Sequence, residues 1–160
     1  MAPQGQKYLI SACLLGENVH YDGKNCMQTQ LKQWIEQQQA ICICPEVTGG
    51  LSTPRLAAEI QGGDGADVLA GKAKVMTFAG QDVTAEFIQG AKATLALAQQ
   101  HQVTHVILKA NSPSCGSDLI YDGSFTGQKI QGKGVTTALL EQHGFTVMTE
   151  DKFLTQLKKT

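Results

Sequence analysis

The sequence feature that most constrains the fold is the alternation of short apolar runs with amphipathic stretches. Four apolar runs predict buried strands, at residues 8–14, 40–44, 105–110 and 145–150. The amphipathic stretches predict helices at residues 28–39, 83–101, 134–144 and 152–159. Apolar strands that alternate with helices indicate a mostly parallel sheet with helices on both faces. We therefore expect a Rossmann-like α/β fold with a short hairpin, as a single domain over residues 1–160 whose core spans about residues 8–150.

The segments between these elements carry weaker patterns. Residues 46–66 contain many glycines and little periodicity, which predicts a long loop. Residues 67–83 alternate in two short runs, which predicts a hairpin. Thr84 is the candidate N-cap of the helix that follows, and Gly144 is expected at the C′ position of the next helix.

Composition excludes several classes of partner. The chain is 42% hydrophobic and 17% charged, with a formal net charge of -1, so it has no electrostatic footprint for DNA, long RNA or a membrane surface. Its first ten residues resemble neither a signal peptide nor a transit peptide, and no run is long enough to span a membrane. We expect a cytoplasmic protein that acts on a small molecule.

Five cysteines carry the chemical signal. An odd number without an export signal argues against a disulfide framework and favours metal ligands or reactive thiols. Cys13 and Cys44 lie at the ends of the first two predicted strands, and Cys115 lies in the loop after the third. If those strands are neighbours, the thiols meet at the carboxyl edge of the sheet, where ligands bind in such folds. Cys42 is expected in the core, and Cys26 in the core or at the surface beside the first helix.

Three thiolates without a CxxC pair leave several chemistries open. A catalytic zinc is one, with His20 as the plausible histidine ligand. An iron–sulfur cluster is another, in which one iron without a protein ligand acts as a Lewis acid toward a soft substrate atom such as sulfur. A module that binds metal or senses redox conditions without catalysis is the third.

Several blocks resemble the thiouracil desulfidase family from about Leu9 to Glu150. They include "SACLLGENVHYDGK", "CPEVTGGLSTPRLAAEI" and "ILKANSPSCGSDLIYDGSFTG". The resemblance implies an oxygen-sensitive [4Fe–4S] cluster on Cys13, Cys44 and Cys115, with one iron not ligated by protein. It also implies the removal of sulfur from thiolated uracil compounds without net redox change. The substrate would be thiouracil, 4-thiouridine or its monophosphate, and the products the oxo form and hydrosulfide.

The same resemblance implies catalytic roles for Glu46 of "CPE" and Ser112 of "SPSCG". We expect Glu46 to deprotonate the attacking water and Ser112 to hold the substrate or relay a proton. Ser114 either forms the turn or donates a hydrogen bond to a cluster sulfur. The candidate substrate-binding residues are Ser114, Asn111, Lys109, Arg55 and Thr136. Arg55 lies where the chain departs from the family pattern, because Leu56-Ala57 replaces frequent prolines.

Two further stretches suggest loops with special roles. "GQKIQGKG", 127–134, nearly matches a phosphate loop, but Gly134 occupies the magnesium-ligand position, which excludes a nucleoside triphosphatase. The helix start after it, with Thr136 or Thr137, is a candidate site for one substrate phosphate. "YDG" occurs twice, so Asp22 and Asp122 are either matched supports of the site or ordinary turn residues.

Overall fold

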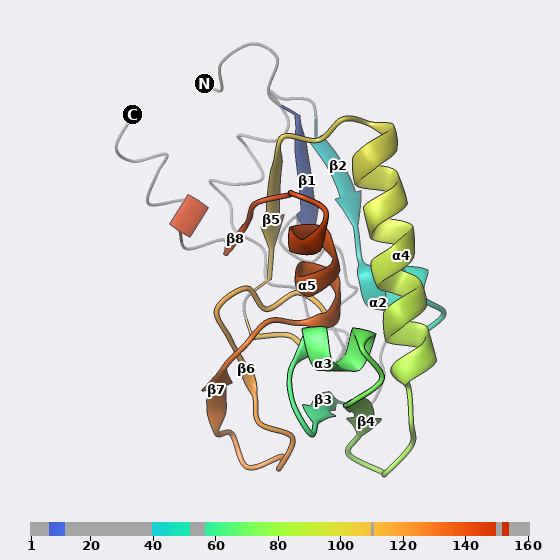
Figure 1. The fold of residues 1–160 in the computed structure, drawn as a ribbon, viewed down its shortest axis with the longest axis vertical. Helices are drawn as coiled ribbons and strands as arrows, with labels where there is room; N and C mark the ends of the chain where they lie inside the picture. Colours follow the sequence, from blue (N-terminus) through green and yellow to red (C-terminus); the bar gives the residue numbers. More distant parts are fainter. Residues whose placement is uncertain (1–6, 12–39, 52–56, 110, 150–151, 154–160) are drawn as a thin grey trace.

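The computed structural model describes residues 7–11, 40–51, 57–109, 111–149 and 152–153 (Figure 1). In chain order its elements are β1 (Tyr8–Ser11), β2 (Ala40–Ile43), α2 (Pro45–Thr48), β3 (Ala58–Gln61), α3 (Gly65–Leu69), β4 (Lys74–Thr77), α4 (Thr84–Gln100), β5 (His105–Leu108), β6 (Leu119–Tyr121), β7 (Lys129–Gln131), α5 (Val135–Gln142) and β8 (Val147–Thr149).

The four predicted strands form one parallel sheet in the order β2-β1-β5-β8. β1 pairs with β2 from Tyr8↔Ala40 to Ser11↔Ile43, and with β5 from Tyr8↔His105 to Ile10↔Ile107. The chain therefore steps from β1 to one side and later returns to its other side. Such a reversal creates a switch point at the carboxyl ends of the strands, here between β1 and β5.

Both faces of this sheet are buried, as expected for apolar parallel strands. On one face, Leu9, Val106 and Leu108 pack with Ala98 of α4 and Leu140 of α5 in one apolar cluster. Figure 1 shows α4 and α5 lying along this side of the sheet.

On the other face, Tyr8, Ile10 and Ile107 are buried, and the Tyr8 ring contacts Phe153 edge to face. The helix predicted at 28–39 lies outside the described residues, as does most of the one predicted at 152–159, of which residues 152–153 are helical.

A second, smaller group of elements lies beyond the carboxyl ends of the strands (Figure 1). We call α3 with the antiparallel pairs β3–β4 and β6–β7 the distal unit. Its core includes Ile60, Val75 and Ile120, and it is joined to the rest of the molecule by Phe87 of α4 and Val135 of α5. Because α4 and α5 contribute to both cores, they connect the sheet to the distal unit.

The distal unit corrects two expectations. Residues 46–66 are not one long loop, since they include α2 and β3 and reach the start of α3. The hairpin predicted within 67–83 is mostly wrong, because β4 pairs with β3 and α3 connects the two strands. Within 67–83 the chain does form one antiparallel bridge, Met76↔Asp82. Asp64 starts α3 by accepting from Ala66 and Asp67, and the Asp67 carboxylate accepts from Asp64 N–H. This capping box lies at the boundary between the predicted loop and the predicted hairpin, where neither pattern indicated a helix.

Of the two predictions for helix ends, one is wrong and one is confirmed. Val83 is the N-cap of α4, whereas Thr84 is its first residue and accepts a hydrogen bond from Val75 N–H. Gly144 lies at the C′ position of α5 with φ +89°, as predicted. The β6–β7 pair had no counterpart among the predicted strands.

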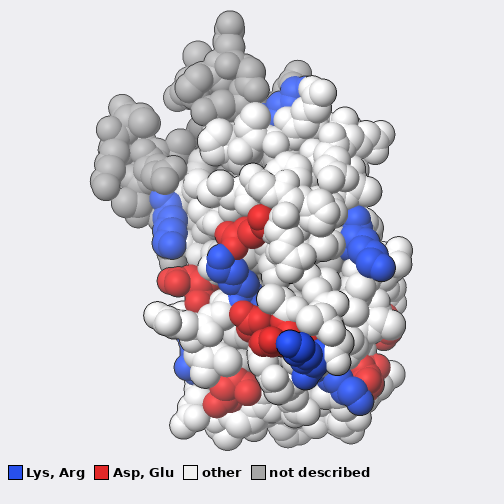
Figure 2. Space-filling model, viewed as in Figure 1, with Lys and Arg blue, Asp and Glu red and all other residues white. Residues whose placement is uncertain are grey.

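Within the described ranges, no helix is long and apolar enough to cross a membrane. On the face shown in Figure 2, acidic and basic side chains are interspersed.

Candidate functional site

The sheet order meets the condition set by the sequence, since β2 and β5 are the two neighbours of β1. Cys44 directly follows β2, and Cys115 lies in the loop after β5. Cys13 comes two residues after the end of β1 and lies outside the described residues. The strands that precede the three cysteines therefore end side by side at one edge of the sheet. In the part of the chain that the structure describes, neither Cys44 nor Cys115 is part of a disulfide.

Cys44 is positioned by the start of α2. Its carbonyl accepts the N–H of Thr48 at 2.9 Å, and Pro45 occupies the first helical position, where a missing N–H costs nothing. A Cβ on Gly90 of α4 would lie 1.9 Å from the Pro45 carbonyl oxygen. The absence of a side chain at Gly90 thus lets the backbone of α4 pack directly against the segment that carries Cys44.

Glu46 is the second residue of α2 in this segment. Its side chain lies outside the described part of the chain, as does that of Cys42. The backbone nevertheless places Glu46 two residues after Cys44 at the carboxyl edge of the sheet.

The second cysteine lies in a loop at residues 111–116, which we call the cysteine loop. Asn111 opens it at φ +70°, a left-handed conformation that Asn tolerates better than most residues. Ser112 Oγ then accepts hydrogen bonds from Ser114 N–H at 3.0 Å and Cys115 N–H at 3.1 Å. Ser112 therefore shapes the turn that presents Cys115, whose side chain is buried.

The start of α5 closes over the cysteine loop from the other side. The first N–H groups of a helix lack partners within it. Here Val135 N–H donates to the Pro113 carbonyl at 2.8 Å, and Thr136 N–H donates to the Ser114 carbonyl at 2.9 Å. The donors proposed for a substrate phosphate are thus engaged by the cysteine loop.

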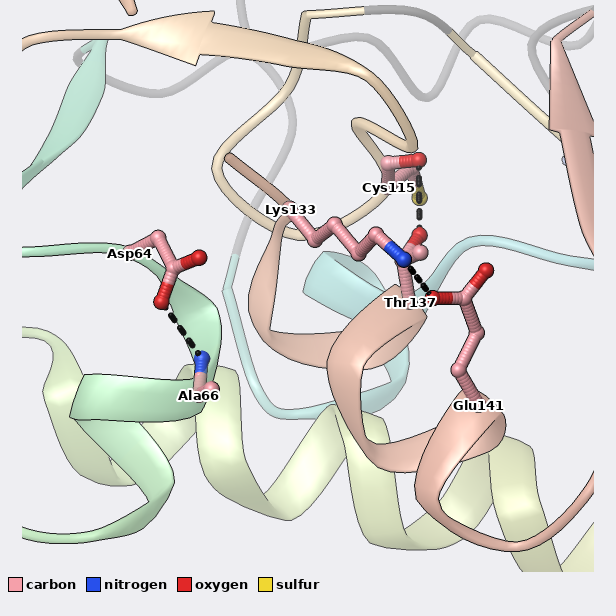
Figure 3. Close-up of polar contacts among 6 residues, drawn as sticks. All are labelled: Asp64, Ala66, Cys115, Lys133, Thr137 and Glu141. Atoms are coloured by element: carbon pink, nitrogen blue, oxygen red, sulfur yellow. Dashed lines mark hydrogen bonds and ion pairs between the residues drawn. The ribbon is translucent and has the colours of Figure 1, made fainter. Parts of the chain in front are cut away.

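Two threonines of α5 extend this contact through their side chains. Thr137 Oγ1 donates to the carbonyl of Cys115 at 2.9 Å (Figure 3). Thr136 Oγ1 lies 2.7 Å from Ser114 Oγ, and both residues are almost fully buried, with exposed fractions of 0% and 1%. The structure therefore places Ser114 and Thr136 inside the contact between loop and helix.

Close backbone packing makes this contact possible. A Cβ on Gly134 would lie 2.4 Å from the carbonyl oxygen of Ser114, and one on Gly65 would lie 2.2 Å from the carbonyl oxygen of Gly134. Beside this stack, Lys133 forms an ion pair with Glu141 (Figure 3). The lysine of the near-phosphate-loop motif thus has a partner within α5.

The other predicted site residues are Lys109, four residues outside the described part of the chain, and Asp122. Lys109 directly follows β5 and is half-buried, so it lies at the carboxyl edge. Arg55 lies outside the described residues, and so do Cys26, His20 and Asp22. Asp122 accepts from the N–H and hydroxyl of Ser124, which hold the pKa of its carboxyl below the usual range. These bonds are those of a turn residue.

Ser117 is a residue that sequence reasoning missed. Its Oγ is buried and has no hydrogen-bond partner in the described part of the chain. The signal was a serine two residues after Cys115, where the polar loop turns toward β6.

Among the described residues, the parallel sheet contains one histidine, His105. His105 begins β5 at the opposite, amino edge and stacks on Tyr8 with ring centroids 5.0 Å apart. Among the described residues, no three His, Cys, Asp or Glu side chains form a candidate metal cluster. Cys13 and the Glu46 side chain lie outside the described part of the chain.

Comparisons with known proteins cover nearly the whole chain. A model of the 2-thiouracil desulfurase family matches residues 8–152. The uncharacterized protein YbbK of Bacillus subtilis (strain 168) is 48% identical over 144 residues, which are 90% of this chain and 95% of YbbK. The solved structure of a [4Fe-4S]-dependent thiouracil desulfidase, TudS, matches with a TM-score of 0.82 and 41% identity. That match covers 97% of this chain and 99% of the TudS chain, and it confirms the predicted α/β fold.

Proposed function

We propose a function from one premise: the chain belongs to the 2-thiouracil desulfurase family. The proposed activity is the desulfuration of a thiolated uracil compound to its oxo form, with release of hydrosulfide and no net redox change. The observation that carries it is the adjacency of β2, β1 and β5, whose carboxyl ends lead into Cys44, Cys13 and Cys115. Thiolates remain reduced in the cytoplasm, where we place the enzyme.

We propose that Cys13, Cys44 and Cys115 hold a [4Fe–4S] cluster with one iron free of protein ligands. Two observations support this fit: neither Cys44 nor Cys115 is held in a disulfide among the described residues, and their strands flank the strand that precedes Cys13. Three thiolates suit an iron–sulfur cluster better than a zinc hydrolase, which usually includes histidine. When bound, the cluster would supply a Lewis acid that polarises the C–S bond of the substrate.

Glu46 is the proposed general base. Its backbone lies two residues after Cys44, at the same edge of the sheet. We propose that its carboxylate takes a proton from water there. The resulting hydroxide would add to the ring carbon, and the C–S bond would break with its electron pair on sulfur. Water and the thio compound thus become the oxo compound, hydrosulfide and a proton.

Ser112 is the proposed second catalytic residue. Its oxygen accepts two backbone N–H groups, which orient the hydroxyl and polarise its proton. We propose that this hydroxyl steadies the charge that develops on the substrate or relays a proton. Lys109, Asn111 and Arg55 remain the proposed substrate-binding residues. We propose that Ser114 and Thr136 act indirectly, by holding the cysteine loop in place.

The engaged donors at the start of α5 bear on the form of the substrate. Because Val135 and Thr136 donate to the cysteine loop, they are not available to a phosphate group. This favours a free base or nucleoside over a nucleotide.

The test begins with protein purified without oxygen. Near-equal iron and acid-labile sulfide, together with conversion of thiouracil to uracil and hydrosulfide, is the expected result. Glu46→Ala should keep the cluster and lose turnover, whereas Cys115→Ala should lose the cluster. A chain that binds zinc instead, or a Glu46→Ala variant with full turnover, would contradict the proposal. A cluster without turnover would favour a redox-sensing module.

A further inference from the structure

The buried hydroxyl of Ser117 lacks the partner that buried polar groups normally have. Its oxygen is shielded from solvent, yet no hydrogen bond reaches it within the described residues. Leaving a hydroxyl in this state lowers stability, because the group loses its hydrogen bonds to water and gains none in the fold. Most buried polar atoms have a partner, so an exception calls for an explanation such as a group that is bound in the working protein.

The backbone around Ser117 is held without help from this hydroxyl. Gly134 N–H donates to the Gly116 carbonyl at 2.8 Å, and Gly132 N–H donates to the Asp118 carbonyl at 3.0 Å. A Cβ on Gly116 would lie 2.8 Å from both Ile120 Cγ2 and the Leu119 carbonyl oxygen. The chain at Ser117 is therefore anchored on both sides, and its hydroxyl serves no visible purpose in the fold.

The position of this hydroxyl limits what its partner can be. Ser117 lies two residues after Cys115, so the two Cα atoms are at most about 7 Å apart. Other hydroxyls of the cysteine loop have partners, because Ser112 Oγ accepts two N–H groups and Ser114 Oγ pairs with Thr136. A serine hydroxyl can donate one hydrogen bond and accept others, and a site of thiolates and sulfides contains only acceptors.

We propose that Ser117 donates a hydrogen bond to an anionic sulfur of the cluster site. This inference rests on the proposed function and deepens it. The acceptor is either a cluster sulfide or the Cys115 thiolate, which share the same chemistry. Hydrogen bonds to the sulfurs help set the reduction potential of an iron–sulfur cluster and the strength with which it is held.

Ser117→Ala has opposite expected effects in the two forms of the protein. Without the cluster, the variant loses only an unpaired hydroxyl, so its stability to urea should equal or exceed that of the wild type. With the cluster, it loses a hydrogen bond that favours the reduced state. The reduction potential should fall, and a chelator should remove iron about tenfold faster. A serine with a purely structural role would instead destabilise the cluster-free protein.

Two further variants serve as controls for the loss of the Ser117 hydroxyl. Ser117→Thr keeps the hydroxyl and should restore the wild-type potential. Ser124→Ala removes an exposed hydroxyl that pairs with Asp122 in the distal unit, and should leave the potential unchanged.

The experiment combines urea unfolding of cluster-free protein with a potentiometric titration of the loaded protein, followed by electron paramagnetic resonance. Lower stability of cluster-free Ser117→Ala, or an unchanged potential, would overturn the inference even if the wild type desulfurates thiouracil. Wild-type protein that takes up no iron and sulfide would overturn the proposed function, and the role of Ser117 with it. Iron and sulfide content therefore separates the two failures.

Discussion

At the scale of single residues, the cysteine loop shows how one hydroxyl can determine where a ligand lies. Thr137 has no exposed surface, and its hydroxyl donates to the carbonyl of Cys115 itself. Removing the hydroxyl would leave that buried carbonyl without this donor. The effect of the change should therefore appear first in how firmly Cys115 is held.

We expect Thr137→Val to destabilise the protein by about 1–3 kcal/mol, because valine keeps the shape of threonine but not its donor. Cluster content after purification without oxygen should fall in parallel. Urea unfolding and iron analysis measure the two effects. Thr146→Val is the matched control, since Thr146 is exposed on the chain before β8 and should change neither quantity. Equal behaviour of the two variants would argue against the role assigned to Thr137.

At the scale of elements, contacts between backbones position the segments that carry the cysteines. Gly90 lies within α4 and faces the carbonyl of Pro45, at the start of α2. In an isolated helix, alanine is favoured over glycine by about 1 kcal/mol. Here the added methyl group would meet backbone that cannot easily move, so packing and helix propensity predict opposite signs.

We expect Gly90→Ala to be destabilising, by about 1–3 kcal/mol as for other overpacked sites. The segment at Cys44 should shift, which should also lower cluster content. Thermal unfolding and iron analysis test both effects. Ala96→Gly, at an exposed position of α4, provides the reference for helix propensity. A stabilised Gly90→Ala variant would show that α2 and α4 do not press on each other as described.

The start of α4 gives a prediction on pH. Hydrogen bonds from the hydroxyl and the backbone N–H of Thr84 lower the pKa of Asp82 in the folded protein. A lowered folded pKa means that the stabilisation is present above the unfolded pKa, about 3.9, and is lost as pH falls through the folded value.

The stability advantage of wild type over Asp82→Asn should therefore be constant near neutral pH and shrink below about pH 4. Urea unfolding of the two proteins from pH 6 to pH 3 measures the difference between them. A difference that grows as pH falls would contradict the sign derived from the Thr84 contacts.

At the scale of the whole molecule, the proposed cluster would join three loops that are far apart in the sequence. The strands before these loops are already held side by side by the sheet. A group that binds the folded but not the unfolded chain adds to stability through its binding free energy. Loss of the cluster should thus lower the free energy of unfolding of the whole domain.

We expect iron removal by a chelator to lower the midpoint of thermal unfolding of the wild type. Cys44→Ala should unfold near the cluster-free wild type with or without chelator, since Cys44 is only partly buried and its loss removes little core packing. Calorimetry of the four samples measures both effects. A chelator that shifts Cys44→Ala as much as the wild type would indicate that Cys44 is not a ligand.

The sequence by itself determined the parallel sheet and which of its strands lead to a cysteine. Apolar runs such as 40–44 and 105–110 can only be buried, and local periodicity reports burial directly. Two of these runs end near a cysteine and a third leads into a loop that carries one, so the carboxyl edge of the sheet was predictable as the candidate site. The family resemblance then supplied the candidate roles of Glu46 and Ser112, which stay predictions.

Only the tertiary structure decided how the cysteine loop is held and how the distal unit is built. β3 and β4 pair across α3, and such non-local pairing leaves no local pattern in the sequence. The start of α5 has the composition of a phosphate site, yet its N–H groups meet the carbonyls of Pro113 and Ser114. Which acceptor a helix N-terminus finds depends on what packs against it. That is a property of the folded chain and not of the motif.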